Sequence, residues 1–91
     1  MGLEFTYHTD PGHGWVEVKR SSLIELDVDL SKISYSYQSR DGRTVYLEED
    51  CAVVPLIEAM KAKKISYEFK VLHTNNEHWI RGLPYFRMDA Q

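Results

Sequence analysis

The chain has 91 residues, 43% of them hydrophobic and 27% charged, with a formal net charge of −3. This length predicts a single domain, residues 1–91, with one modest core. The composition is that of a folded globular protein and excludes a largely disordered one. The weak negative charge gives no general attraction to nucleic acid or to an anionic membrane, so we expect neither as a partner.

The first part of the chain predicts a hairpin and a short helix. Residues 3–8 and 15–19 alternate apolar and polar side chains, which is typical of strands with one buried face. The sequence DPGHG at residues 10–14 separates them and favours a shaped turn. Ser22 and Glu25 then match a capping box, so we predict that a short helix begins there.

The middle of the chain predicts a second hairpin that leads into the longest helix. Residues 33–38 and 44–49 alternate, and the Asp-Gly pair at 41–42 favours a tight turn between antiparallel strands. From Val53 the apolar residues take the period of a helix that we expect to end near Lys64. Pro55 supports this start, because proline fits only near the beginning of a helix.

The remaining residues complete the predicted fold. Residues 65–71 should form a fifth strand, and residues 78–86 a short sixth strand or an extended tail, because Gly82 and Pro84 disfavour a helix. The order ββαββαβ predicts an α+β two-layer sandwich, with a mainly antiparallel sheet of five or six strands and both helices on one face. A second copy of the chain could cover the other face, so a homodimer is one expected assembly.

One group of residues has the chemistry of a metal site. His8, Asp10 and His13 place imidazole and carboxylate ligands around one turn, and His73 or His78 could complete a zinc site. The spacing matches no established metal motif, so ordinary turn residues without a metal are the favoured interpretation. We therefore predict no metal ligand and no cofactor.

Cys51 is the only cysteine, so no intramolecular disulfide is expected. It lies where a predicted strand meets the main helix, a position in which backbone amides favour a thiolate. A nucleophile assisted by His8 or His13, with Asp10 orienting the base, is conceivable. The acidic residues 48–50 oppose it, and a buried structural cysteine is favoured, which leaves an enzyme as the third alternative.

Acidic and aromatic residues are better candidates for binding. Glu48 and Asp50 share a face and could attract basic residues of a partner, although solvated charge is the plainer interpretation. Trp15 shares its strand face with Glu17 and Lys19, so we expect its ring to be partly exposed and available for contact.

A second set of residues suggests a nucleotide pocket. Tyr37 and Tyr46 could stack a nucleobase, and Arg81, with Arg20, Arg40 and Arg43, could hold a phosphate. The alternative is that the tyrosines simply form one face of the sheet.

Three blocks of the chain resemble a group of small proteins of phages, prophages and their bacterial hosts. The blocks are YHTDPGHGW at residues 7–15, ISYSY at 33–37 followed by YLEEDC at 46–51, and IRGLPY at 80–85. The resemblance carries no catalytic residues over to this chain. It implies a setting in which small accessory proteins disable a host defence component or sequester its nucleotide messenger.

The sequence thus favours a non-enzymatic inhibitor of a host defence complex that docks through the loop from Asp10 to Trp15, with His13, and through the acidic corner. The alternative is a protein that sequesters a nucleotide. No segment has the roughly 18 apolar residues of a membrane span, and residues 1–10 lack the features of a signal peptide. We therefore expect a cytoplasmic location.

Overall fold

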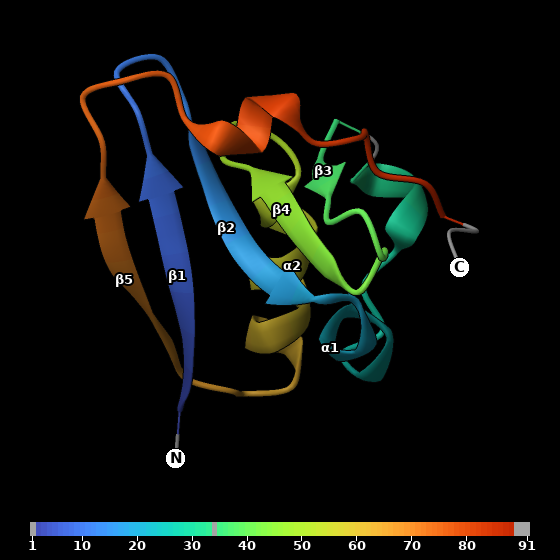
Figure 1. Ribbon diagram of the computed structural model, residues 1–91. Coiled ribbons are helices and arrows are strands. Elements are labelled where there is room, and N and C mark those ends of the chain that lie inside the picture. Colours follow the sequence, from blue (N-terminus) through green and yellow to red (C-terminus); the bar gives the residue numbers. More distant parts are fainter. Residues whose placement is uncertain (1, 34, 89–91) are drawn as a thin grey trace.

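The computed structural model describes residues 2–33 and 35–88, which form a five-stranded mixed sheet with two α-helices (Figure 1). The strand order is β3-β4-β2-β1-β5, with antiparallel pairing except between β1 and β5, which are parallel. The predicted α+β sandwich is therefore confirmed. The elements are β1 (Leu3–Thr9), β2 (Gly14–Lys19), α1 (Arg20–Glu25), η1 (Leu30–Lys32), β3 (Tyr37–Gln38), β4 (Thr44–Glu48), α2 (Val53–Ala62), β5 (Tyr67–His73) and η2 (Trp79–Gly82), where η denotes a 3₁₀-helix.

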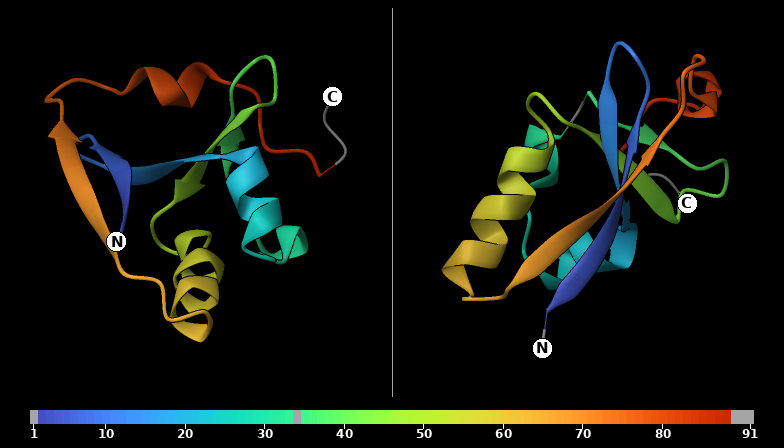
Figure 2. Two further views of the ribbon diagram at one scale, coloured as in Figure 1. Left: turned by 90° about the horizontal axis from the view of Figure 1, so that it is seen from below. Right: turned by 90° about the vertical axis from the view of Figure 1, so that its left-hand side faces the viewer.

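Both α-helices lie on one face of the sheet and enclose the main core (Figure 2). The strand alternation directs Val16 and Leu47 to this face, where they meet Leu56 and Met60 of α2. The last three of these side chains are fully buried. None of the helices among the described residues is long and apolar enough to cross a membrane.

The C-terminal segment covers part of the opposite face and forms a second, smaller core. Ile80 of η2 packs there with Trp15 of β2 and Tyr46 of β4. The right-hand view of Figure 2 shows η2 and α2 on opposite sides of the sheet. The C-terminal segment of the same chain thus covers part of the sheet face for which the sequence suggested a second copy.

Three local predictions were wrong. Helix α1 begins at Arg20 without a side-chain cap, because β2 turns directly into it and Ser22 lies inside the helix. Strand β3 covers only Tyr37 and Gln38, since residues 30–32 form η1 and the amide of Ser36 bonds back to Ile33 in a turn. Ser34, within that predicted strand, lies outside the described residues.

The third difference concerns the C-terminal segment, which contains a turn of 3₁₀-helix at Trp79–Gly82 where a sixth strand or an extended tail was expected. The side chain of His78 caps η2 by accepting a hydrogen bond from the amide of Ile80 at 3.1 Å. Beyond it, Tyr85 makes a single β-bridge to Tyr37. A short 3₁₀ turn can end at Gly82, whereas a longer α-helix would have to continue through Gly82 and Pro84, which are both unfavourable inside a helix.

Candidate functional site

A cleft of about 360 Å³ lies where the β1–β2 loop, the end of β4 and the C-terminal segment meet. Six of the binding residues that the sequence suggested line this cleft, whereas Asp10, Tyr46 and the suggested arginines other than Arg81 do not. The lining residues are His13, Trp15, Tyr35, Tyr37, Glu48, Asp50, Cys51, Arg81 and Tyr85. We take it as the candidate functional site because it brings together acidic and aromatic side chains from distant parts of the chain.

Asp10 does not line the cleft but binds residues that do. Its carboxylate accepts hydrogen bonds from the backbone amides of Gly12 and His13 at 2.9 Å and from that of His78 at 3.0 Å. The guanidinium of Arg81 donates to both carboxylate oxygens, at 2.8 and 3.0 Å. These bonds, above all the one from Arg81, hold the pKa of Asp10 well below its usual range. Asp10 thus remains ionised and ties the first hairpin to η2.

Arg81 forms part of the cleft wall with its charge balanced. Both of its hydrogen bonds to Asp10 are charge-assisted, and together they make a bidentate pair. Its guanidinium carbon also lies 5.1 Å from the centre of the Trp15 ring, a distance suited to a cation–π contact. Arg81 therefore holds the indole ring and the β1–β2 loop in place. Its positive charge is balanced by the carboxylate of Asp10 and attracts an anionic ligand only weakly.

Tyrosines form one wall of the cleft. The rings of Tyr37 and Tyr85 stack with their centres 5.2 Å apart and an interplanar angle of 21°. Tyr85 is 69% exposed, and Tyr35 is 76% exposed. Burial and then the neighbouring Tyr85 raise the pKa of Tyr37, so its phenol stays neutral. This wall offers flat aromatic surface to a partner.

Carboxylates also line the cleft. One Glu48 oxygen accepts from the amides of Asp50 and Cys51 at 3.0 and 3.2 Å, which fixes the corner between β4 and α2. The other lies 3.4 Å from Nδ1 of His13. Ligand atoms of His13, Glu48 and Asp50 lie within 4.8 Å of one another, so they could bind one divalent cation or one cationic side chain.

Glu49 points to the other side of the sheet, as the alternation predicts. Its carboxylate accepts a hydrogen bond from the hydroxyl of Tyr7. Burial first, then this bond and the nearby negative charge raise the pKa of Tyr7 to about 12. Gly14 is needed beside them, because a Cβ atom there would lie 2.6 Å from the Tyr7 ring. Glu49 is thus a structural residue and contributes no wall to the cleft.

The predicted metal and cysteine constellations are not assembled as the sequence suggested. His8 is buried under the C-terminal segment, where its ring meets those of His78 and Trp79, and its Nε2 atom lies 2.7 Å from Glu17. Asp10 is occupied by Arg81 and by backbone amides, so it orients no catalytic base. Cys51 is exposed, not buried, because it lies in the turn before α2.

The expected exposure of Trp15 was also wrong, since it is only 1% exposed. The C-terminal segment covers its strand face, and its buried indole N–H has no acceptor among the described residues. Tyr46 is 7% exposed and lies under Trp79, whose ring meets it edge-on. Neither ring offers a surface for docking, whereas the sequence interpretation missed the exposed ring of Tyr85. Tyr85 lies beside β3 because of a β-bridge to Tyr37, a tertiary contact that the local sequence does not indicate.

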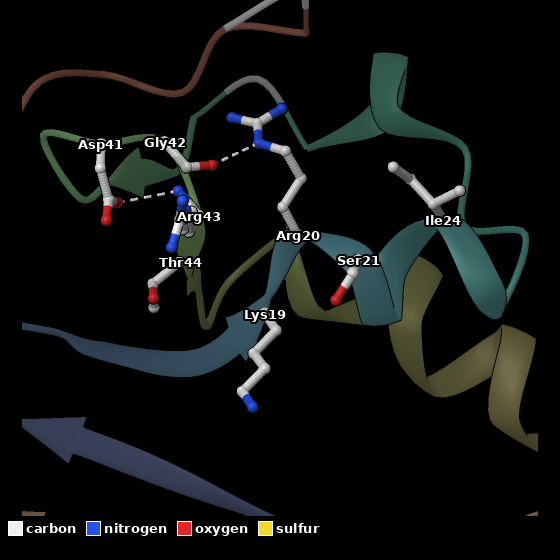
Figure 3. Close-up of a pocket in the computed structure, with 8 residues that line it drawn as sticks. All are labelled: Lys19, Arg20, Ser21, Ile24, Asp41, Gly42, Arg43 and Thr44. Atoms are coloured by element: carbon white, nitrogen blue, oxygen red, sulfur yellow. Dashed lines mark hydrogen bonds between the residues drawn. The ribbon is translucent and has the colours of Figure 1, made fainter. Parts of the chain in front are cut away.

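Arg20 and Arg43 line a different hollow, of about 740 Å³, between β2, α1 and the β3–β4 turn (Figure 3). Arg20 is engaged there by the carbonyl of Gly42 at 2.6 Å and by the side chain of Gln38 at 2.7 Å. Figure 3 shows Lys19 pointing away from Arg20. None of the described residues lining the hollow is aromatic. Arg20 and Arg43 therefore lie apart from the tyrosines of the suggested nucleotide pocket, whereas Arg81 lines the same cleft as Tyr37.

Comparison with known proteins adds no identity: no family model, curated protein or solved structure matches the chain.

Proposed function

We propose that the protein is a non-enzymatic binding module whose cleft receives a basic side chain of a partner protein. The observation that carries this proposal is the bidentate bond between Arg81 and Asp10. It neutralises the one arginine that lines the described cleft, and it leaves Glu48 and Asp50 as negative charges in a cleft that exposed tyrosines also line. An acidic and aromatic cleft fits an arginine or lysine side chain.

Arginine suits this cleft better than lysine. Its planar guanidinium can lie against the ring of Tyr85 while its N–H groups donate to Glu48 and Asp50. A cation over an aromatic ring at an exposed site contributes about 0.5–1 kcal/mol. Hydrogen bonds to a charged carboxylate contribute about 1.5–3 kcal/mol each. A single arginine anchored in this way could dominate a modest interface.

The same charges weigh against a bound nucleotide in this cleft. A phosphate would face two carboxylates, and the guanidinium of Arg81 is already taken by Asp10. Arg20 and Arg43 lie in the hollow without aromatic lining residues. We therefore rank protein docking above nucleotide sequestration, the alternative that the sequence left open.

The proposal corrects the docking surface that the sequence suggested. Trp15 is buried, so contact falls to the exposed Tyr35 and Tyr85 and to the acidic corner. Together with the three phage-like sequence blocks, this surface supports the proposal of an inhibitor that binds an arginine of a host defence complex.

Peptides that differ at one position test the proposed function. We expect a peptide with a central arginine to bind in calorimetry and its citrulline counterpart, which has the same shape without the charge, to bind at least about tenfold more weakly. Glu48→Gln and Tyr85→Ala should each weaken arginine binding by about threefold or more. Glu25→Gln and Trp79→Ala are matched controls, since both residues are exposed outside the cleft. Equal binding of arginine and citrulline peptides would overturn the proposal.

A further inference from the structure

Strand β5 is an edge strand, and the N–H and C=O groups on its outer side pair with no strand of the described sheet. Its one partner in the described sheet is β1, and Figure 1 shows no element on its outer side. The carbonyl of Ser66 accepts from Leu3, and the amide of Thr74 donates to Thr9. Since backbone groups alternate direction along a strand, the even-numbered residues of β5 face β1. The odd-numbered residues 67, 69 and 71 therefore direct their N–H and C=O groups outward.

The two faces of this edge differ in chemistry. Tyr67, Phe69 and Val71 share the face that carries the helices, where the ring of Phe69 lies 5.4 Å from that of Tyr67 and 6.3 Å from that of Phe5. This apolar row is incompletely covered, because Tyr67 and Phe69 are half-buried and Val71 is 57% exposed. The opposite face carries the exposed, oppositely charged side chains of Glu68 and Lys70.

We propose that a second copy of this chain pairs with β5 in antiparallel fashion, with the two-fold axis at Phe69. In this register Phe69 faces its counterpart, and Tyr67 faces Val71 of the other copy. Glu68 faces Lys70 of the other copy, and the same pair repeats by symmetry. The two sheets join into one continuous sheet with α2 of both copies on the same side.

The backbone geometry supports this register. Residues 67, 69 and 71, whose N–H and C=O groups point outward, fall at the hydrogen-bonded positions of the new ladder. Glu68 and Lys70 then fall at the non-hydrogen-bonded positions, where opposite side chains approach most closely. Shifting the pairing by two residues would place Lys70 opposite Lys70 or Glu68 opposite Glu68. Opposite charges favour the register centred on Phe69 over both neighbours.

The proposal is independent of the cleft, because β5 and β3 lie at opposite edges of the sheet. The cleft residues lie on the β2–β4–β3 side, so pairing through β5 leaves both clefts of the dimer open. A strand-to-strand interface is small, below about 1,200 Å² of total buried area, so dimerisation should depend on protein concentration.

Charge-reversal variants test the register. In sedimentation equilibrium across the micromolar range, we expect the wild-type protein to form a dimer. Glu68→Lys and Lys70→Glu should each weaken it at least about tenfold, because both symmetric pairs become repulsive. The double variant restores opposite pairs, and so does an equimolar mixture of the two single variants, so both samples should dimerise again. A wild-type monomer throughout, or a dimer that neither single variant weakens, would overturn the proposal.

Proline substitutions test the edge itself. Val71→Pro removes an outward N–H group and should abolish the dimer while keeping the thermal transition of the monomer. Leu72→Pro is the matched control, since its N–H group faces β1, and it should lower the transition temperature. A dimer that survives Val71→Pro would show that the copies associate elsewhere.

Discussion

Replacing Trp15 by alanine should disrupt the second core. The substitution changes none of the charged residues of the cleft. The side chain is 1% exposed and packs with Tyr46 and Ile80. Truncating a buried tryptophan to alanine costs about 3–5 kcal/mol. A 91-residue domain has a free energy of unfolding of roughly 5–14 kcal/mol, so the variant should lose a large share of it. At about 4–8 °C per kcal/mol, its transition temperature should fall by at least about 12 °C.

Circular dichroism during urea and thermal denaturation measures this loss. Trp79→Ala is the matched control, because Trp79 is 57% exposed and its removal should cost about 1 kcal/mol or less. Trp15→Phe should lose less than Trp15→Ala, since it keeps an aromatic ring and removes the unpaired buried N–H group. If Trp15→Ala cost less than about 1 kcal/mol, the indole would not be enclosed as described, and Trp15 would return as a docking residue.

Two predictions concern pH and are read from denaturation midpoints. Burial first, then the neighbouring His8, lowers the pKa of His78, so the native state favours the neutral ring that caps Ile80. Stability should therefore fall as the pH drops below about 6.5, the ordinary histidine pKa. His78→Asn, which keeps a capping oxygen, should flatten this dependence, and an unchanged slope would contradict the assignment. At the other end, the pKa of Tyr7 is raised to about 12, so stability should fall between about pH 10 and 12. Tyr7→Phe should remove this alkaline loss, and its persistence would point to another group.

The strands and the main helix were predictable because their signals are local. Alternation along residues 15–19 and 44–49 located β2 and β4. The change of period at Val53, together with Pro55, gave the start of α2. The Asp-Gly pair correctly indicated the turn, in which Gly42 has a φ of 76°.

The covered face of the sheet was not predictable, because its cover comes from 3₁₀-helical residues with no periodic signal. The polar neighbours Glu17 and Lys19 suggested that the strand face of Trp15 is exposed to solvent. In the structure Ile80 of the C-terminal segment packs against Trp15 and buries its side chain. The parallel pairing of β5 with β1 is likewise a tertiary choice that no local pattern records. The salt bridge from Asp10 to Arg81 joins residues 71 positions apart, so its neutralising effect became visible only in the structure.

For the candidate site, sequence reasoning found most of the residues but assigned some wrong roles. Glu48 and Asp50 were expected together, but His13 was grouped with His8 and Asp10, and the structure instead brings its ligand atom within 4.8 Å of theirs. Tyr37 was expected in a nucleotide pocket with arginines, but its ring stacks on Tyr85. Their residue types were sufficient to mark them as binding candidates, whereas their partners depended on the fold.

The central claim, that the cleft receives a cationic side chain, is tested most directly by an NMR titration with N-acetylarginine amide and its neutral citrulline analogue. The account predicts that only the arginine compound shifts the amide signals around Tyr37, Glu48 and Tyr85, and that Glu48→Gln reduces those shifts. Equal shifts with both compounds, or shifts of these signals with adenosine monophosphate alone, would contradict it.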